Sequence, residues 1–203
     1  MTDRLQPTEE GIARATQLLL AGELVAFPTD TVYGVGVAAS RGDRIEALFE
    51  LKRRPPDRRI PLLVTSLAQA ANEGWGEPDE RAGALAERFW PGALTIVLWT
   101  DHGRQTQAFR APDHPVALAL IRAAGPIFTT SANVSDEPDT LGADDVLIAF
   151  ATQQDELAAV LDGGVVPGGV ASTVVDLSVT PARVLREGPI GAAELAEVVE
   201  LAP

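Results

Sequence analysis

The stretch L-V-A-F-P-T-D-T-V-Y-G-V-G occupies residues 24–36 and is the most informative part of this chain. It begins with a short apolar run, which is typical of a buried strand. Pro28 cannot donate to a strand ladder, so we expect the strand to end there. Small hydroxyl residues, an acid and glycines follow, and Gly34 and Gly36 let the backbone approach another group closely. The pattern indicates either a binding loop delivered by a buried strand or a β-turn at a sheet edge.

The length of 203 residues predicts one domain over residues 1–203, large enough to bury a substantial core. A hydrophobic content of 46% with 22% charged residues is typical of a soluble globular protein. No apolar run approaches the ~20 residues of a membrane span, and the polar N-terminus is unlike a secretory signal. The absence of cysteine excludes disulfides and thiolate chemistry and favours a cytoplasmic protein.

The net charge of −13 argues against broad contact with a nucleic-acid backbone, because most of the surface would repel it. A local basic groove could still bind a phosphorylated ligand or RNA. The chain has two histidines, His102 and His114, both near proline or glycine. We therefore expect neither a His-based metal site nor a Ser–His–Asp triad, and we interpret both histidines as surface or structural residues.

Helical and strand patterns alternate along the chain, which predicts an α/β fold. Thr8 and Gly22 are suited to cap the first helix, and a second helix is expected to begin at Asp43 and end near Lys52. Further helices are expected after Ser66 and Asp79, from Pro115, and over residues 143–151 and 192–200. Strands are expected over residues 24–27, 62–65, 94–99, 107–110, 126–130, 157–161, 173–177 and 182–186. Helices do not separate every pair of strands, so the sheet should be mixed.

A basic cluster, Lys52-Arg53-Arg54 with Arg58 and Arg59, stands out from the acidic background. In an extended segment, Lys52 and Arg54 would share one face and could bind phosphate oxygens. Five cations in eight residues would repel one another without a nearby anion. The alternative is a solvated basic loop at a helix end.

Ser131 and Asn133 follow the strand expected over residues 126–130 and would project to the same side. A hydroxyl and an amide at a strand end can hold a sugar, a phosphate or a carboxylate. They could equally bond their own backbone in a turn. Taken one at a time, the cluster and this pair are explained as well by such local structure as by ligand binding.

Arg110, Ser172 and Arg186 are further polar residues at or near expected strand ends, where open α/β sheets usually bind ligands. The glycine-rich loop over residues 163–169 lacks the G-K-[ST] ending of a Walker A motif, and no G-x-G-x-x-G follows the first expected strand. Asp30 could hold a metal or cap a turn.

Seven short motifs occur in an order that resembles the YrdC-like threonylcarbamoyl-AMP synthases. They span residues 15–195 approximately, nearly the whole chain. The motifs are P-T-D-T-V-Y-G, K-R-R-P, F-W-P-G-A-L-T, F-R-A-P-D-H-P, S-A-N-V-S, A-S-T-V-V-D and L-R-E-G. Each is weak alone, and their order makes the resemblance specific.

The resemblance implies a twisted open mixed sheet flanked by helices, the YrdC/RibB-like fold, with a positively charged groove. It implies an L-threonylcarbamoyladenylate synthase, a nucleotidyltransferase that makes threonylcarbamoyl-AMP and pyrophosphate from L-threonine, bicarbonate and ATP. Other proteins then transfer the threonylcarbamoyl group to tRNA in t6A modification. Mg²⁺ is the expected cofactor, because several anions must be packed together. The chain resembles the short form, without the extra C-terminal domain of longer members.

The same resemblance assigns roles to individual residues. Lys52 and Arg54 fill the family's K-x-R pair and are implied to act on the ATP phosphates in catalysis. The nucleotide set also contains Ser131, Asn133 and Arg186. The implied threonine-binding set is Thr29, Arg110 and Ser172, with Arg110 as the partner of the carboxylate. We expect alanine at Lys52 or Arg54 to weaken ATP use and leave the fold intact, because both residues are expected in a polar loop, and alanine at Arg110 mainly to weaken threonine binding.

Three positions depart from the family's pattern. Asp136 follows the S-A-N-V-S motif where glycine is frequent, Thr65 occupies a position where some members have histidine, and Glu187 replaces the usual proline. These changes leave open a paralogue with a different acyl acceptor or with weakened activity. A second alternative is an RNA-binding or ribosome-assembly accessory protein, which the net charge disfavours. Oligomeric state, metal ligands and the general base are not specified by the sequence.

Overall fold

A computed structural model of the chain describes residues 2–53, 60–71, 80–100, 105–135, 137–153 and 155–203. It contains one ten-stranded sheet in the order β1-β8-β2-β3-β7-β4-β6-β5-β9-β10. Parallel and antiparallel neighbours alternate irregularly along it: β8 pairs in parallel with both β1 and β2, whereas β3 is antiparallel to β2 and β7. The predicted mixed sheet is therefore confirmed.

The strands are β1 (Asp3–Leu5), β2 (Leu24–Phe27), β3 (Gly34–Ala38), β4 (Leu62–Leu63), β5 (Leu94–Thr100), β6 (Gln105–Arg110), β7 (Ile127–Ser131), β8 (Leu157–Leu161), β9 (Thr173–Asp176) and β10 (Arg183–Arg186). The helices are α1 (Glu9–Ala21), η1 (Ala39–Arg44), α2 (Ile45–Leu51), α3 (Leu67–Ala70), α4 (Glu80–Phe89), α5 (Pro115–Ala124), α6 (Ala143–Ala149) and α7 (Ala192–Ala196). None of the helices described is long and apolar enough to cross a membrane.

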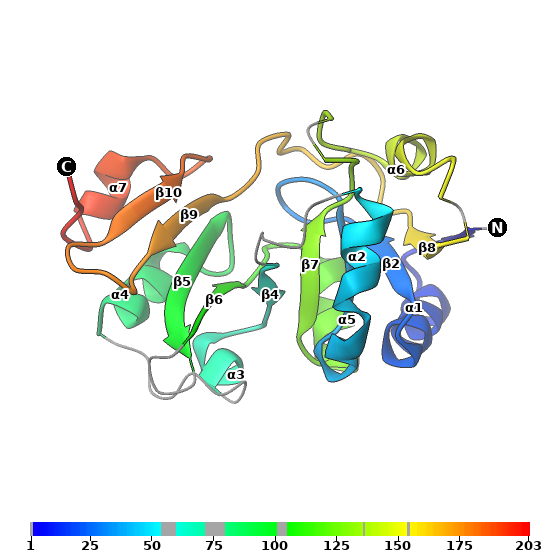
Figure 1. The fold of residues 1–203 in the computed structure, drawn as a ribbon, viewed down its shortest axis with the longest axis horizontal. Helices are drawn as coiled ribbons and strands as arrows, with labels where there is room; N and C mark the ends of the chain where they lie inside the picture. The colour runs from blue at the N-terminus through cyan, green and yellow to red at the C-terminus, as the bar shows by residue number, and fades with distance from the viewer. Residues whose placement is uncertain (1, 54–59, 72–79, 101–104, 136, 154) are drawn as a thin grey trace.

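We call β1, β8, β2, β3 and β7 the first half of the sheet, on the right of Figure 1. Helices cover both of its faces. Val25 and Phe27 of β2 pack with α1 and α5, whereas Leu24 and Ala26 of the same strand pack with α2 and α6. All four residues of β2 are buried, which explains why this strand is a continuous apolar run.

The second half of the sheet comprises β4, β6, β5, β9 and β10, on the left of Figure 1. One face of this half packs against α3, α4 and α7 and carries Leu94, Ile96, Phe109 and Val175. Successive side chains of a strand point to opposite faces. The alternating residues of β5, β6 and β9 therefore point to the other face, where they line a cavity.

Local signals placed most helix ends correctly. Thr8 accepts a hydrogen bond from the Gly11 amide at the start of α1, and Gly22 ends that helix with a positive φ of 88°. Ser66 caps α3, as predicted. The cap expected at Asp79 lies outside the described residues.

Other elements differ from the sequence-based expectations. The second helix begins at Ile45, and Asp43 lies in η1 with its carboxylate bound by Arg41. The last helix, α7, is shorter than expected and ends at Ala196. Two strands, β1 and β3, were not expected at all. Gly34 and Gly36 belong to β3 and lie against β7, so close that a side chain at Gly36 would meet the Phe128 carbonyl at 2.5 Å.

The two halves are also joined by the segment after β8. It crosses from the first half to β9 along one edge of the molecule, in yellow to orange in Figure 1. Here the Gly169 amide donates to the Thr31 carbonyl, and a side chain at Gly168 would meet that carbonyl at 2.4 Å. The glycine-rich loop is thus pressed onto the P-T-D-T loop, which accounts for its composition without a ligand.

Candidate active site

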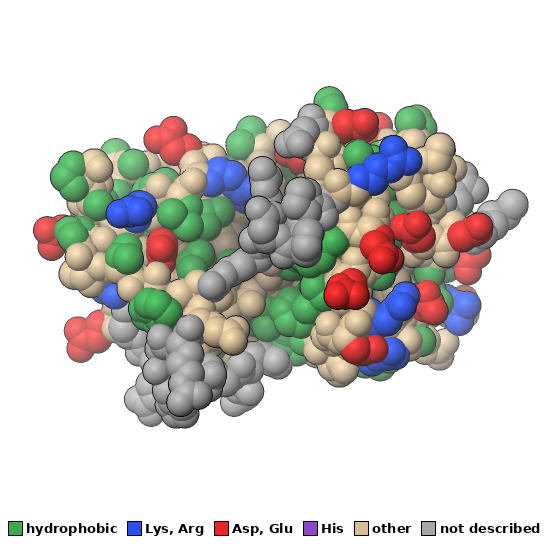
Figure 2. Space-filling model, viewed as in Figure 1, with side chains coloured by type: hydrophobic (Ala, Val, Ile, Leu, Met, Phe, Trp, Pro, Cys, Tyr) green, Lys and Arg blue, Asp and Glu red, His purple; other side chains and the backbone are tan. Residues whose placement is uncertain are grey.

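A cavity of about 840 Å³ lies on the open face of the second half and reaches the end of β7 in the first half. Thr95 and Val97 of β5 and Val174 and Asp176 of β9 contribute to its wall. Hydrophobic side chains are visible on this side of the molecule near the junction of the two halves (Figure 2). The cavity therefore has an apolar floor with polar groups at particular strand positions, as is usual for small-molecule sites.

Seven of the eight predicted site residues line this cavity, and the eighth, Arg54, lies outside the described residues. The seven are Thr29, Lys52, Arg110, Ser131, Asn133, Ser172 and Arg186. They come from segments that are far apart in sequence, in both halves of the sheet. Their meeting in one hollow is the arrangement that the predicted binding sets require.

Arg110 ends β6 and is held on three sides. Its Nε donates to the Gly92 carbonyl at 2.9 Å, its Nη1 to Thr31 Oγ1 at 2.8 Å and its Nη2 to Asp30 Oδ1 at 2.6 Å. Burial lowers the pKa of the Arg110 guanidinium and the Asp30 carboxylate opposes that shift, so the guanidinium stays charged. Two of its five N–H groups have no acceptor among the described residues, and they can bind a carboxylate.

Asp30 therefore has a role that the sequence did not indicate. Its carboxylate accepts from Arg110 and from the Asp113 amide, and the ion pair with Arg110 is largely buried. These contacts add a third function to the two considered for Asp30, a metal ligand or a turn cap. The residue keeps the guanidinium in place at the cavity wall.

Thr29 and Thr31 are bonded to each other, with 3.1 Å between their hydroxyl oxygens. Thr29 Oγ1 also donates to the Val32 carbonyl at 2.6 Å and accepts from the amides of Thr31 and Val32. These bonds fix the turn after Pro28 as a hydroxyl-stabilised turn. The loop that follows the buried strand lines the cavity with Thr29 and Thr31, and its binding of a ligand stays a prediction.

Lys52 is the only lysine in the chain; the other 15 of its 16 basic residues are arginines. It caps α2 with helical backbone angles and is 3% exposed, so the expectation of an extended polar loop at this residue is wrong. Its Nζ donates to the carbonyl oxygens of Ser131 and Asn133, at 2.5 and 2.6 Å, and to Asn133 Oδ1 at 3.0 Å. Three converging acceptors match the three hydrogens of an ammonium group.

Ser131 and Asn133 complete this network. Ser131 Oγ donates to Asn133 Oδ1 at 2.6 Å, and Asn133 Nδ2 donates to the Glu137 carbonyl at 2.6 Å. The turn after β7 is therefore built from its own side chains and from Lys52. Of the two alternatives weighed for the Ser131–Asn133 pair, the turn is confirmed; that turn lines the cavity, and ligand binding by the pair stays a prediction.

Arg186 and Ser172 are in direct contact across β9 and β10. Arg186 Nε donates to the Ser172 carbonyl at 2.9 Å, and Nη2 donates to Ser172 Oγ at 3.2 Å. Gly188 permits this approach, because a side chain there would meet the Thr173 amide at 2.4 Å. Partial burial lowers the pKa of Arg186, and the carboxylate of Asp139, another cavity residue, opposes the shift.

Thr95 is a cavity residue that sequence reasoning missed, and Thr31 was expected in the loop after Pro28 but was given no role. Thr31 binds Arg110, and Thr95 Oγ1 lies 2.8 Å from Ser172 Oγ. Thr95 is part of the F-W-P-G-A-L-T motif, and its position as the one polar residue within the apolar run of residues 94–99 was the available signal. The signal for Thr31 was its position beside Thr29 in the same turn.

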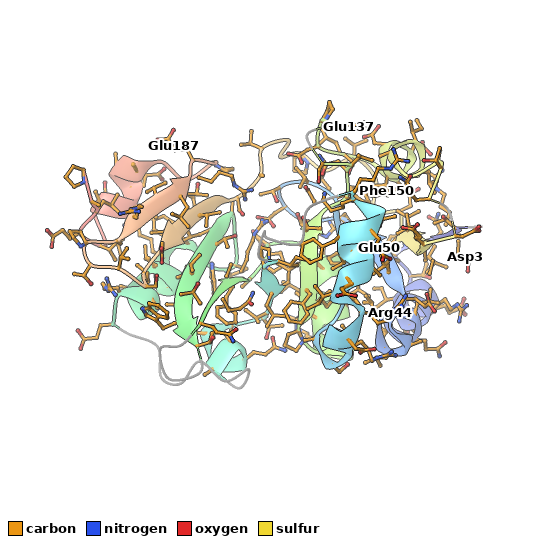
Figure 3. The ribbon with its side chains drawn as sticks, in the orientation of Figure 1. Asp3, Arg44, Glu50, Glu137, Phe150 and Glu187 are labelled. Carbon is orange, nitrogen blue, oxygen red and sulfur yellow. The ribbon has the colours of Figure 1, made fainter. Side chains whose placement is uncertain are left out.

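Two of the three departures from the family's pattern, Thr65 and Glu187, are described by the structure, and neither lines the cavity. Thr65 Oγ1 donates to the Gln69 side chain at 2.8 Å, next to α3. Glu187 is exposed and points outward at the edge of the second half (Figure 3). Asp136 lies outside the described residues. His114 is structural, as expected: its Nδ1 accepts from the Val116 amide at the start of α5, whereas His102 lies outside the described residues.

Known proteins resemble this chain over most of its length. The family model Sua5/YciO/YrdC, described as "Telomere recombination", matches residues 17–188. The threonylcarbamoyl-AMP synthase of Bacillus subtilis is 38% identical and covers 98% of this chain. A putative threonylcarbamoyl-AMP synthase of Mycobacterium tuberculosis is 38% identical over 93% of this chain and 89% of its own length.

Solved structures agree with the sequence relatives. Sua5 of Pyrococcus abyssi, in complex with L-threonine, superposes with a TM-score of 0.90 at 34% identity over 100% of this chain. Escherichia coli YciO has a TM-score of 0.82 at 22% identity and shares the fold. The chain spans 59% of the length of the B. subtilis relative and 63% of the P. abyssi protein. By the family model, the relatives and the shared sheet, the chain belongs to the Sua5/YciO/YrdC family.

Proposed function

We propose that this protein is an L-threonylcarbamoyladenylate synthase, which converts L-threonine, bicarbonate and ATP to threonylcarbamoyl-AMP and pyrophosphate. The observation that carries the proposal is the meeting of seven predicted substrate-binding residues in one cavity. The names of the relatives and the threonine complex of P. abyssi Sua5 support the same substrate. We place the reaction in the cytoplasm, where its tRNA pathway and a cysteine-free chain both fit.

Threonine is best placed beside Arg110 and the P-T-D-T loop. The two remaining N–H groups of Arg110 can bind the carboxylate as a fork. Thr29, Thr31 and Ser172 surround that position with hydroxyl groups. Because Asp30 neutralises Arg110 before substrate arrives, the site can hold the guanidinium in a fixed direction without leaving an unpaired buried charge.

ATP is best placed near the Ser131–Asn133 turn and Arg186. Arg186 lies within 4 Å of no carboxylate among the described residues, so its charge is available to a phosphate. Lys52 contributes a second positive charge from beneath the turn, with its hydrogens committed to the turn's acceptors. We therefore assign Lys52 as a positioning residue for the nucleotide site and Arg186 as the residue that contacts phosphate.

The chemistry needs positioning and charge stabilisation, with no side chain as the nucleophile. Well-oriented reactants lower the barrier by about 7–11 kcal/mol, and each placed donor adds about 3–4 kcal/mol. The two arginines would stabilise the carboxylate and the negative charge that builds at the phosphate. An acidic surface around a basic cavity also directs anionic substrates to that cavity.

Mg²⁺ is proposed to enter with ATP. The described residues include no group of three or more His, Asp or Glu side chains suited to hold a metal. Asp139 and Asp176 reach the cavity singly, and Asp176 Oδ1 already accepts from the Ser178 amide and hydroxyl. This donor set does not fit a metal held by the protein alone, and we assign no step to one.

The test is a purified protein supplied with labelled threonine, bicarbonate, Mg²⁺ and ATP. We expect pyrophosphate release that depends on threonine, together with a product that carries both the threonine and the adenylate label. Pyrophosphate release without threonine dependence would contradict the proposal and favour a paralogue with another acceptor. A salt-sensitive shift of tRNA in the absence of substrates would favour the RNA-binding alternative instead.

The product joins a carbamate to a phosphate in a mixed anhydride, which water can cleave, so we propose that the tRNA threonylcarbamoyl-transfer proteins consume it directly. Adding those proteins and tRNA should increase threonine incorporation into the tRNA. A reaction in which they do not use the product would exclude that partnership.

A further inference from the structure

A pair of hydroxyl groups lies at the floor of the cavity, on neighbouring strands. Thr95 Oγ1 of β5 and Ser172 Oγ before β9 are 2.8 Å apart, and Thr95 is 2% exposed. One hydrogen lies between the two oxygens, whichever group donates it. Since each hydroxyl carries one hydrogen, the hydrogen of the other hydroxyl remains to be donated to a ligand in the cavity.

A cation completes this pair. Arg186 Nη2 donates to Ser172 Oγ at 3.2 Å, which places the guanidinium next to the hydroxyl pair. Arg186 is also close enough to Arg110 for charge repulsion between them to lower the pKa of Arg110. The two guanidinium groups face one cavity. Arg110 forms an ion pair with Asp30, and the described residues give the two arginines no other ion pair. The two positive charges therefore favour an anion in the space that they share.

The position of the pair between the two predicted sets of residues is the decisive feature. Ser172 belongs to the threonine set, Arg186 belongs to the nucleotide set, and the two are hydrogen-bonded. In the reaction proposed above, the third substrate must touch both the threonine amine and the α-phosphate. The contact between Ser172 and Arg186 marks the place where the two sets of residues adjoin.

We infer that Thr95, Ser172 and Arg186 form the subsite for bicarbonate and for the carbamate made from it. The inference rests on the proposed function and assigns a binding residue, Thr95, that the resemblance did not assign. A planar oxyanion of one carbon atom fits this set: one oxygen accepts from the hydroxyl pair, and another accepts from the guanidinium.

The step at this subsite balances without a redox partner. Threonine first loses its ammonium proton to solvent. Its amine nitrogen then forms a bond to the bicarbonate carbon, the C–OH bond breaks, and the hydroxide leaves as water with an amine proton. The resulting carbamate keeps two oxygens at the subsite. One of these oxygens then attacks the α-phosphorus, and the bond from that phosphorus to the pyrophosphate oxygen breaks.

The test removes the hydroxyl of Thr95 and keeps its shape. In buffer depleted of carbon dioxide, Thr95→Val should raise the KM for bicarbonate about tenfold, the usual effect of losing one hydrogen bond to a charged group. The KM values for threonine and ATP should change less than about twofold, which corresponds to about a third of the free energy of a tenfold change. Thr95→Ser restores the hydroxyl and should restore the KM.

Thr100→Val is the matched control. Thr100 is a threonine of the same strand, β5, outside the cavity lining, and the same chemical change there should leave the KM for bicarbonate unaltered. If Thr95→Val does not fold, as judged by thermal denaturation, Thr95→Ala replaces it in the comparison with Thr95→Ser. Equal KM values for bicarbonate in wild type and the folded variant, in an active enzyme, would overturn the subsite and leave the proposed function standing.

A binding measurement separates this inference from the proposed function. With threonine and a non-hydrolysable ATP analogue present, wild type and Thr100→Val should broaden the NMR line of ¹³C-bicarbonate saturably, and Thr95→Val should not. That result supports the subsite even in a protein that releases no pyrophosphate with threonine. Broadening that is the same in all three proteins, or absent from all three, would overturn the subsite.

Discussion

The two halves of the sheet use their faces differently. In the first half, helices cover both faces, and a strand such as β2 is apolar at every position. In the second half, helices cover one face, and β5 and β9 alternate between core residues and cavity residues. The difference teaches that the cavity lies on a face of the sheet that no helix among the described residues covers, so the uncovered part of the sheet forms the cavity wall.

The comparison predicts that substitution of Arg110, in the buried ion pair of the second half, has the largest effect on stability. Arg110→Ala leaves Asp30 buried with its main partner removed, so we expect a loss of about 3–5 kcal/mol in the free energy of unfolding. Urea denaturation measures it, and threonine binding should be lost in parallel. A double variant with Asp30→Ala as well should be less destabilised than Arg110→Ala alone. An unfolding midpoint equal to that of wild type would show that the pair does not hold this face together.

Substitution of Lys52, at the junction between the halves, should have the next largest effect on stability. Lys52→Met removes the ammonium that holds the Ser131–Asn133 turn, and we expect a loss of about 2–3 kcal/mol together with weaker ATP binding. Lys52→Arg keeps the charge, but a planar guanidinium cannot reach the same three converging acceptors, so it should recover the stability only in part. Calorimetric titration with ATP and thermal unfolding measure the two effects. Full recovery in Lys52→Arg would mean that charge alone matters at this position.

A matched pair of valine substitutions compares the covered and open faces directly. Val25→Thr buries a hydroxyl between the sheet and the helices α1 and α5 and should cost about 1–3 kcal/mol. Val97→Thr makes the same change on the cavity wall, where water can reach the hydroxyl, and should cost less than about 0.5 kcal/mol. Denaturant unfolding of both proteins under one condition provides the measurement. Equal costs would contradict the distinction between the faces.

The smallest effect on stability is expected for substitution of His114, at the start of helix α5, which packs on the first half of the sheet. Burial lowers the pKa of His114 below its ordinary value of 6.5, while Asp30 and Asp113 oppose the shift. The unfolded chain therefore binds the proton more readily, and this residue's contribution is present above pH 6.5 and lost as the pH falls. His114→Asn keeps a capping side chain without this titration, so its stability should fall less between pH 7.5 and 5.5, by about 1 kcal/mol or less. Parallel curves for the two proteins would contradict the prediction.

The fold could be predicted where the signals were local. Thr8, Gly22 and the apolar run of β2 define their elements through neighbours in sequence, and they were placed correctly. The strand β3 was missed because its glycines disfavour a strand, and its pairing with β2 and β7 imposes the conformation from outside. The edge strand β1 was missed because it is short and polar and forms only by pairing with β8.

The site could be predicted as a set of residues and not as a set of contacts. The order of motifs identified seven cavity residues, but nothing in the sequence joins Asp30 to Arg110, which are 80 positions apart. The burial of Lys52 was missed for the same reason, since its acceptors lie on a turn that is distant in sequence. Long-range packing decides these contacts, and a single sequence carries no direct signal of it.

One consequence of the basic composition concerns chemical labelling. Because Lys52 holds the chain's sole side-chain amine, any acylating reagent that modifies a lysine must modify this one, and peptide mass spectrometry can report the yield at a single known site. The yield would then measure how often the Ser131–Asn133 turn opens, since the amine is shielded while the turn is closed. An arginine-rich sequence has in this way left the protein with a built-in reporter of the turn that lines its cavity.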